Sequence, residues 1–470
     1  MAASFRAADF QGWAVINDLE HGDELVDFVA AKPLLLPGLA LDLGTTHLEA
    51  SLLDMAEGRV LAKADRPNGQ IDFGTDILTR IHFAARPGGL EQLQAAVVAT
   101  IAELAGDLCG QAGCGPEEIR GMSVSGNTTM VHLLLGLSPA TICREPYIPL
   151  VNWLDPCLAS ELDLPFHPGA RVWFFPSVGS YFGGDLIAGI VAAELADQEE
   201  LSLLIDVGTN AEVVLGNKDF LIACAGAAGP ALEGGIARMG MRAGPGAIEK
   251  VRIHAEEPGL TVDCQTIGAA PPRGLCGSGI IDLVAALYLS QLIDIRGKFK
   301  TKRWPERFVE SKDGLAFVVV PAKESQGGES VLFSQVDLDA MMRSKAAMYA
   351  ILSTLLAQVD VQFSQLQRIF VAGSFGKHID PRQAITLGML PDLDLATFQA
   401  IGNSSLAGAQ QVLLNGDKRR LARQLPAKIT YLELNVNQDF MIRFSGCRFI
   451  PHTDPALFPS VPHFPGDTGN

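Results

Sequence analysis

Two short segments contain residues whose types and spacing suit nucleotide chemistry. Each has an aspartate at the end of an apolar run, followed by a glycine and a threonine: Asp42-Leu43-Gly44-Thr45-Thr46 and Asp206-Val207-Gly208-Thr209-Asn210. A carboxylate in this position can hold hydrated Mg²⁺, which keeps several of its waters in protein sites. The glycine lets the backbone approach a phosphate, and the neighbouring amides and hydroxyls can donate to it. The pattern therefore predicts two loops that bind the phosphates of a nucleoside triphosphate.

Either segment alone has a second interpretation. Asp-x-Gly-Thr also makes an ordinary turn at a strand end, in which the aspartate side chain bonds to nearby backbone. Both segments, however, follow an apolar strand and precede a returning strand. We expect this paired occurrence to reflect a duplicated fold, because a cleft between similar domains is a favoured ligand site. Asp42 and Asp206 are then the predicted catalytic carboxylates, and both are expected to hold Mg²⁺ through water.

Length and composition limit the classes of protein to consider. The 470 residues, of which 48% are hydrophobic and 19% charged, imply two or more globular domains. The sequence has no apolar run of about 18 residues, and its first residues lack the pattern of a signal peptide. The net charge of −17 argues against binding to nucleic acid, which depends on clustered Lys and Arg. We therefore expect a cytoplasmic protein that binds neither nucleic acid nor membrane.

The chain is predicted to repeat one plan of strands and helices. In the first half we expect strands at 39–42, 48–54, 59–65, 121–124 and 171–175, with helices around 90–104, 128–135 and 184–197. In the second half we expect strands at 202–206, 211–216, 219–224 and 368–372, with helices ending near 290, at 381–388 and at 404–414. The expected divisions are an extension or linker remnant at 1–37, domains at 38–200 and 201–425, and a C-terminal segment at 426–470. This alternation indicates an α/β protein.

The order of the motifs resembles the ATPase superfamily that contains sugar kinases, actin and the chaperone ATPases. Its pattern is a first phosphate loop, a second phosphate loop and an adenosine motif, and the third is similar to residues 371–376. The resemblance implies two duplicated ribonuclease H-like domains with an interdomain nucleotide cleft, the actin-like ATPase fold. It also implies ATP and Mg²⁺ as ligands. The implied nucleotide-binding residues are Gly44, Thr45, Thr46, Gly208, Thr209, Asn210, Glu233, Gly373, Ser374, Phe375 and Gly376.

Some of these positions have plainer alternatives. Residues 373–376 also fit a generic glycine turn between a strand and a helix. Glu233 lies in a glycine-rich segment, where it is either a nucleoside contact or a solvated carboxylate. Asn127 and Thr128 follow a strand at about the place where sugar kinases contact their substrates. The sequence leaves these alternatives open.

Longer segments narrow the resemblance to the reductive activators of corrinoid proteins. The similar segments are residues 126–136, 206–217, 226–234, 240–243, 274–282, 449–454 and 458–460. They span the chain from roughly residue 38 to residue 462 and occur in the order of that family. The resemblance implies an ATP-hydrolysing activator enzyme, which returns a corrinoid methyl-transfer protein from Co(II) to Co(I). A corrinoid protein is therefore the expected partner, and the sequence is compatible with a homodimer.

The cysteines depart from that family's pattern. Its members usually carry an iron–sulfur domain, whereas the eight cysteines here run from Cys109 to Cys447 without a C-x-x-C pair. Cys109 and Cys114 have the first spacing of a plant-type cluster, but the third cysteine that should follow closely is missing. We therefore expect no intrinsic iron–sulfur cluster and a separate low-potential electron donor.

Three other functions remain open on the sequence. A small-molecule kinase of the sugar-kinase type has the same fold, and fold alone does not fix function. A nucleotide-dependent scaffold would use the same loops without a reaction. A dehydratase-type activator needs a cluster held by cysteines of two subunits, which the cysteine spacing disfavours.

Overall fold

The computed structural model describes residues 2–7, 9–19, 22–208, 210–226, 237–256, 259–434 and 436–464. The chain forms two compact units, each made of two stretches of sequence. Unit 1 comprises Met1–Ala196 and Asn403–Ile429, and unit 2 comprises Asp197–Gly402 and Thr430–Asn470. Each unit encloses its own hydrophobic core.

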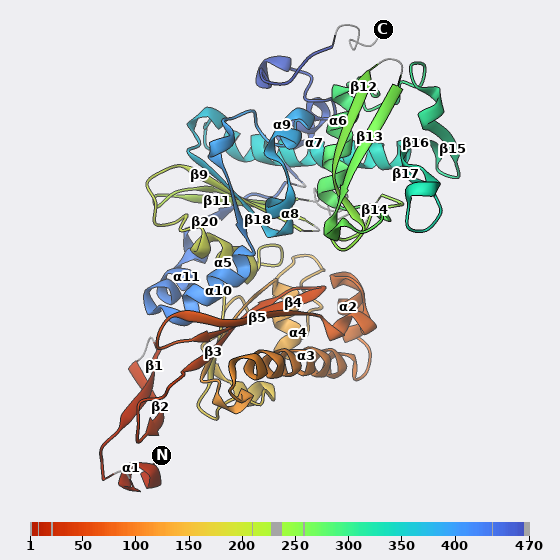
Figure 1. The fold of residues 1–470 in the computed structure, drawn as a ribbon. Coiled ribbons are helices and arrows are strands. Elements are labelled where there is room, and N and C mark those ends of the chain that lie inside the picture. The colour runs from red at the N-terminus through yellow and green to blue at the C-terminus, as the bar shows by residue number, and fades with distance from the viewer. Residues whose placement is uncertain are drawn as a thin grey trace. The chain divides into compact units, whose positions relative to one another are not determined.

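Unit 1 is built on a six-stranded sheet in the order β5-β4-β3-β6-β8-β7. The central strand β3 pairs antiparallel with β4 and parallel with β6, and β8 continues the parallel part. A separate two-stranded hairpin, β1–β2, precedes the sheet (Figure 1). The strands are β1 (Trp13–Leu19), β2 (Gly22–Val29), β3 (Pro37–Leu43), β4 (His47–Asp54), β5 (Arg59–Pro67), β6 (Gly121–Gly126), β7 (Cys157–Leu158) and β8 (Arg171–Phe174).

The helices of unit 1 that pack on or around this sheet are α2 (Ile77–Ala84), α3 (Gly89–Ala112), α4 (Thr128–Leu134), α5 (Gly184–Ala192), α10 (Ser404–Leu414) and α11 (Gly416–Lys428). The short helix α1 (Ala2–Ala7) lies apart from them, at the end of the β1–β2 hairpin (Figure 1). Within the described chain, α3 alone is long and apolar enough to cross a membrane. Its apolar stripe, which includes Leu93, Val97, Ile101 and Leu104, is fully buried in the core of unit 1. α3 is therefore a core helix, and it ends where Gly113 takes the left-handed conformation that favours glycine.

Unit 2 repeats the same sheet. Its order is β19-β18-β9-β10-β11-β20, and β9 pairs antiparallel with β10 and parallel with β18, as β3 does with β4 and β6. The strands are β9 (Ser202–Val207), β10 (Ala211–Gly216), β11 (Leu221–Gly226), β18 (Arg368–Ala372), β19 (Phe398–Gly402) and β20 (Ile429–Tyr431). The five strands shared by the two sheets follow one topology, which confirms the duplicated α/β fold predicted from the sequence.

Unit 2 also contains two small sheets and the longest helix of its core. The small sheets are β12 (Ala247–Glu256) with β13 (Gly259–Thr266) and β14 (Gly274–Leu275), and β15 (Phe308–Ser311) with β16 (Gly314–Val320) and β17 (Val331–Ser334). The helices are α6 (Gly277–Leu289), α7 (Gln335–Ala357), α8 (Gly373–His378), α9 (Pro381–Leu387) and α12 (Gln438–Cys447). α7 is buried along most of its length.

The division of the chain differs from the predicted domain boundaries at 38–200, 201–425 and 426–470. Residues 403–429 belong to unit 1, because α10 packs against β3, β6 and α5; the Ser123 hydroxyl of β6 donates to the Ala409 carbonyl of α10 at 2.6 Å. The segment from Thr430 onward belongs to unit 2 and does not form a separate part. The predicted helix at 184–197 is shorter and ends at Ala192.

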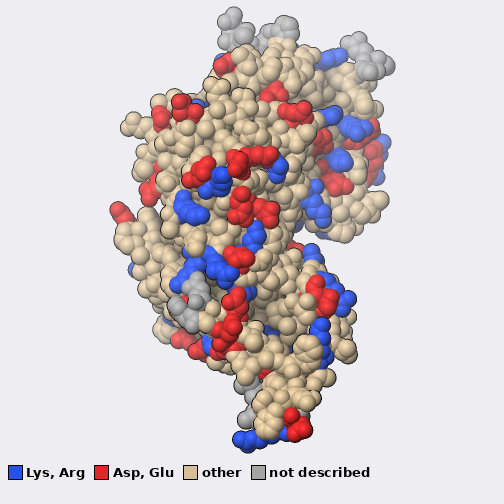
Figure 2. Space-filling model, turned by 90° about the vertical axis from the view of Figure 1, so that its left-hand side faces the viewer, with Lys and Arg blue, Asp and Glu red and all other residues tan. Residues whose placement is uncertain are grey.

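The charged surface is mixed in sign. Figure 2 shows acidic and basic side chains interspersed over one face, although acidic residues are in excess over the whole chain. On that face the positive charges are divided among small groups, whereas nucleic-acid binding surfaces usually present a continuous basic patch.

Candidate nucleotide-binding site

The carboxylate of Asp42 lies near the end of β3 and is bonded to the start of α10. Its Oδ1 accepts a hydrogen bond from the Ser405 hydroxyl at 2.7 Å, and its Oδ2 accepts one from Asn403 Nδ2 at 2.8 Å. Burial raises the pKa of Asp42, and the nearby charge of Glu49 raises that pKa further. The hydrogen bonds from Ser405 and Asn403 act in the opposite direction, because they stabilise the charged form.

Glu49 faces Asp42 across the antiparallel pair β3–β4. The two residues are register partners, and Asn403 Nδ2 also donates to Glu49 Oε2 at 2.7 Å. One amide group therefore bridges two carboxylates, one through each of its hydrogens. Sequence reasoning did not select Asn403, Ser405 or Glu49. The sequence signal that was present is the Asn-Ser-Ser start of an apolar helix, which is typical of an N-cap.

The turn that follows Asp42 requires a glycine. A Cβ atom at Gly44 would lie 2.4 Å from the His47 carbonyl oxygen, which is too close for any other residue. Asn68 supports the outside of this turn: its Nδ2 donates to the Gly44 carbonyl at 3.0 Å, and its backbone N–H donates to the Thr46 carbonyl at 2.9 Å. The first predicted phosphate loop is thus a tight turn whose position is fixed by β5 and its following residues.

Thr45 connects this loop to the next strand of the sheet. Its hydroxyl accepts a hydrogen bond from Asn127 Nδ2 at 3.1 Å, and Asn127 Oδ1 caps α4 by accepting from the Met130 amide at 3.0 Å. The structure therefore brings Asp42, Gly44, Thr45 and Asn127 to one end of the unit 1 sheet. Parallel strands place their carboxyl ends at the same edge, and ligands of α/β proteins bind at such edges.

The second predicted loop occupies the equivalent place in unit 2. Asp206 lies near the end of β9 and is the register partner of Glu212 on β10, as Asp42 is of Glu49. The Gly208 amide donates to the Asn210 carbonyl at 2.9 Å, which closes the turn. Both sheets therefore carry an aspartate and a facing glutamate beside a glycine turn.

The predicted adenosine motif meets this second loop. Gly373 follows β18, which runs parallel to β9, and has a φ of +75°, in the left-handed region. A Cβ atom at Gly373 would lie 3.3 Å from Asp206 Oδ1, so only a glycine leaves this space beside the carboxylate open. At Gly376 a Cβ atom would lie 2.2 Å from the Val371 carbonyl, which explains the second glycine of the motif.

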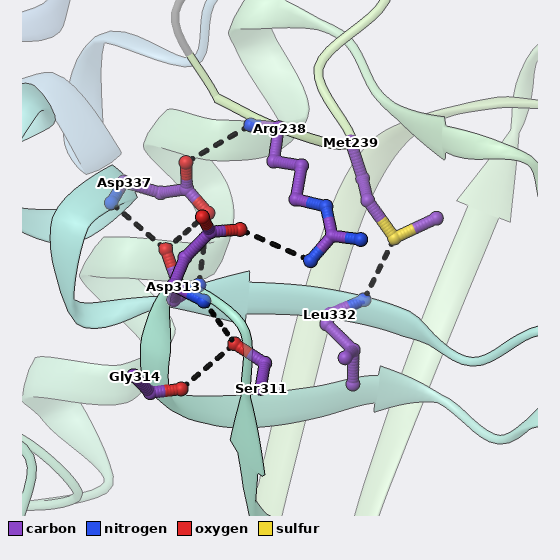
Figure 3. A network of polar contacts seen from close by, with 8 residues as sticks. Arg238, Met239, Ser311, Asp313, Gly314, Leu332 and Asp337 are labelled. Carbon is purple, nitrogen blue, oxygen red and sulfur yellow. Dashed lines mark hydrogen bonds and ion pairs between the residues drawn. The ribbon is translucent and has the colours of Figure 1, made fainter.

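Four of the predicted nucleotide-binding residues are not described in full. Thr209 and Glu233 lie outside the described residues, and so do the side chains of Ser374 and Phe375. The described part of the glycine-rich segment after residue 236 is anchored at Arg238 (Figure 3). The Arg238 amide donates to Asp337 Oδ1 at 2.9 Å, and its guanidinium pairs with Asp313 at 3.0 Å. The end of this segment is thereby fixed to the first turn of α7 and to the β15–β16 turn.

The carboxylate of Asp42 suits a metal-bound water. Each carboxylate oxygen offers about two acceptor positions, so Asp42 keeps capacity for such a water after bonding Ser405 and Asn403. Over the described ranges, no group of three or more His, Cys, Asp and Glu side chains is placed to hold a metal ion directly. All eight cysteines are free thiols.

A small cavity beside α4, with room for about one water molecule, surrounds His132. Its lining includes Thr128, His132, Trp153 and Phe175, and none of its lining residues carries a carboxylate. His132 Nδ1 lies 2.7 Å from the Thr128 carbonyl, and its Nε2 lies 3.5 Å from the Val151 amide, so both ring nitrogens have partners. Burial lowers the pKa of His132. The histidine is structural.

Family profiles match nearly the whole chain. The RACo middle region matches residues 37–198, and the C-terminal domain of RACo, its ASKHA domain, matches residues 200–462. The chain belongs to the RACo family. The boundary between these two profiles falls where the chain passes from unit 1 to unit 2 for the first time.

Individual relatives agree with the RACo profiles. The chain is 32% identical over 441 residues to the corrinoid activation enzyme RamQ of Eubacterium limosum, a match that covers 92% of this chain and 73% of RamQ. It is 24% identical over 420 residues to a [Co(II) methylated amine-specific corrinoid protein] reductase of Methanosarcina barkeri, covering 84% and 73% of the two chains. A solved structure of a reductive activator for corrinoid, iron-sulfur protein is 41% identical with a TM-score of 0.86, covering 98% of this chain and 73% of that one. These matches confirm the family and the actin-like ATPase fold predicted from the sequence.

Proposed function

We propose that this chain is an ATP-dependent activator that returns a corrinoid protein from Co(II) to Co(I). The observation that carries the proposal is the pair of aspartate loops on equivalent strands of duplicated sheets, within a chain matched by RACo profiles from residue 37 to residue 462. RamQ and the Methanosarcina barkeri reductase are named for action on corrinoid proteins.

In this proposal the residues of both loops bind and orient the nucleotide. Bound ATP with Mg²⁺ supplies the free energy of a phosphoanhydride bond. Asp42 and Asp206 would hold metal-bound water at the ends of β3 and β9, and amides of the two loops would donate to the phosphate oxygens. The glycine turn that begins at Gly373 would lie against the nucleoside beside Asp206.

A cycle of ATP binding and hydrolysis can supply the free energy that reduction of Co(II) to Co(I) requires. Reduction of Co(II) is unfavourable when an axial ligand stabilises Co(II). A protein that binds the ligated and unligated forms with different affinities can shift the equilibrium between them. A population shift of about 10⁴ needs about 5.5 kcal/mol. At about 59 mV per tenfold change for one electron, this corresponds to about 240 mV.

The electron comes from a separate donor in this proposal. The eight cysteines of the sequence contain no C-x-x-C pair, and Cys109 and Cys114 lack the closely following third cysteine of a plant-type cluster. A low-potential protein or chemical reductant would therefore supply the electron, while this chain supplies the nucleotide-driven step.

The test combines the chain, ATP-Mg²⁺, a low-potential reductant and a Co(II) corrinoid protein from the same source, with Co(I) followed by its absorbance. We expect Co(I) to form only with ATP, and we expect Asp206→Ala to abolish both Co(I) formation and ATP hydrolysis. Asp219→Ala is the matched control, because this exposed aspartate lies at the opposite end of β10. If a sugar or another hydroxyl compound accelerates ATP turnover while Co(II) stays unreduced, the protein is a kinase and the proposal is wrong.

A further inference from the structure

Arg80 on α2 is a buried cation without an ion-pair partner among the described residues. Its side chain is fully buried, its Nε donates to the Gly74 carbonyl at 2.8 Å, and its Nη2 has no hydrogen-bond partner in that part of the chain. The carboxylate whose charge acts on it, Asp76, is exposed and caps the start of α2. Burial lowers the pKa of Arg80 to about 10, so the guanidinium stays charged at neutral pH. Buried charges are normally paired, so this one requires an explanation.

The Arg80 guanidinium is bonded to residues that support the first predicted phosphate loop. Its Nη1 donates to Gln70 Oε1 at 3.1 Å. Gln70 is also fully buried, and its backbone N–H donates to Asn68 Oδ1 at 3.0 Å. Asn68 Nδ2 in turn donates to the Gly44 carbonyl at 3.0 Å. A continuous chain of contacts therefore leads from Arg80 to the loop.

Met130 on α4 provides a second route to the same loop. Its Sδ accepts from Arg80 Nη1 at 3.2 Å, and its backbone N–H donates to Asn127 Oδ1 at 3.0 Å. Asn127 Nδ2 donates to the Thr45 hydroxyl at 3.1 Å. The two routes end on consecutive loop residues, Gly44 and Thr45. The position of the loop therefore depends on the buried network around Arg80.

The direction of these hydrogen bonds suits a loop that binds an anion. The Gly44 carbonyl accepts from Asn68 and shares a peptide group with the Thr45 N–H. An accepted hydrogen bond polarises the peptide, so that its N–H becomes a stronger donor. The positive charge of Arg80 behind Asn68 acts in the same sense, because it attracts negative charge toward the loop.

We propose that Arg80 is a positioning residue of the first phosphate loop, and that its buried charge strengthens the binding of nucleotide phosphates there through Gln70 and Asn68. This inference rests on the proposed function and adds a residue of α2 to that site. The facing carboxylates of Asp42 and Glu49 repel a phosphate. A positive charge fixed in the interior offsets this repulsion, needs no rearrangement when the nucleotide binds, and is screened less by salt than a surface charge.

Titration calorimetry with ATP-Mg²⁺, ADP-Mg²⁺ and adenosine tests the inference. Arg80→Met removes the charge and leaves an unbranched apolar side chain. Gln70→Glu keeps Arg80 and a side chain of the same size, but places a carboxylate against the guanidinium that cancels its charge. We expect the Kd of ATP-Mg²⁺ to rise about tenfold in each variant, that of ADP-Mg²⁺ to rise less, and that of adenosine to stay parental, because the effect acts on phosphate charge. A loss of packing alone would weaken all three ligands alike.

Arg120→Met is the matched control. Arg120 is an arginine of unit 1 with 13% of its side chain exposed, and its Nε also has no partner among the described residues. It pairs with Asp27 of β2 at 2.8 Å rather than with the loop. Arg120→Met should therefore lose stability but bind all three ligands like the parent.

Melting temperatures show which variants are folded, and Gln70→Glu decides alone if Arg80→Met does not fold. The inference is overturned if the folded variants bind ATP-Mg²⁺ with parental affinity, or if they lose affinity for adenosine to the same extent. The proposed function then stands, provided that the parent hydrolyses ATP. A parent chain that binds no ATP-Mg²⁺ would overturn both.

Discussion

Lys345 illustrates how one buried side chain fixes the end of the chain. Its ammonium group is fully buried on α7 and donates to the carbonyls of Phe449 and Pro451, the latter at 2.8 Å. Burial lowers the pKa of Lys345 from 10.5 to about 7. Together with Leu434, Cys447 and Ile450, which lie in the core of unit 2, this contact holds the segment after Thr430 to that unit.

Lys345→Met should destabilise the protein, because it leaves two buried carbonyls without their donor at a cost of about 1–3 kcal/mol each. The difference in the free energy of unfolding between parent and Lys345→Met should grow as the pH rises. Between about pH 7 and pH 10 the unfolded lysine holds a proton that the folded one has released, so the stability of the parent rises with pH in this window. The variant lacks this contribution. Calorimetry at pH 7 and pH 9 measures the difference in melting temperature.

The exposed Lys323 provides the control, since Lys323→Met removes the same amine from the surface and should leave the melting temperature nearly unchanged. If the difference between parent and Lys345→Met is the same at both pH values, Lys345 keeps an ordinary pKa in the folded state and the argument is wrong.

The sequence predicted the local part of the site and missed the long-range part. Asp42 and Gly44 were predicted because a strand end followed by a glycine turn is a pattern within a few residues, and Gly373 because residues 371–376 resemble an adenosine motif. Asn403 contacts Asp42 from 361 residues further along the chain. Nothing in a single sequence pairs those two positions, and an asparagine at a helix start already has a sufficient local explanation as an N-cap.

At the scale of helices and strands, the predictions that succeeded are those for segments in which the spacing of apolar residues is clear. The predicted strand at 211–216 and the predicted helix at 404–414 match β10 and α10. The sequence did not predict α7, because this helix is buried on most sides and lacks the polar stripe that marks a surface helix. It did not predict β13 either, although the apolar Leu260, Val262 and Cys264 alternate with polar residues along this strand, as in a half-buried strand.

The contact between α5 and α10 depends on a glycine. A Cβ atom at Gly408 on α10 would lie 2.2 Å from the carbonyl oxygen of Ala188 on α5. Gly408→Ala should therefore force the two helices apart and reduce the free energy of unfolding by about 1–3 kcal/mol. The shift should also move Asn403 relative to Asp42, so ATP hydrolysis should fall together with stability.

Gly106→Ala is the matched control for this prediction. Gly106 lies inside α3 with no atom within 4 Å of the added Cβ, so alanine should be neutral or stabilising by up to about 1 kcal/mol. Thermal unfolding of both variants tests the argument. Equal melting temperatures for Gly408→Ala and Gly106→Ala would mean that the α5–α10 contact tolerates a larger separation.

At the scale of the whole molecule, the chain consists of two units with separate cores, each with one predicted phosphate loop. The chain passes between the units at three places, and one of them is the Gly402–Asn403 junction beside Asp42. Two cores can in principle unfold and respond to ligands independently. Binding of one nucleotide by residues of both loops would instead couple them, because a ligand stabilises every part that it contacts.

Hydrogen exchange with and without ATP-Mg²⁺ tests this coupling. We expect ATP to slow amide exchange in peptides that cover β3–β4 in unit 1 and in peptides that cover β9–β10 in unit 2, because each pair of strands carries one aspartate loop. Under the proposed function one nucleotide is bound by both loops, and Asp42→Ala should then reduce the protection in both units, including the one that contains no substitution. Asp219→Ala should leave the protection in both at the parental level. Protection confined to one unit would mean that only that unit's aspartate loop binds the phosphates, and that the other is an ordinary turn at a strand end.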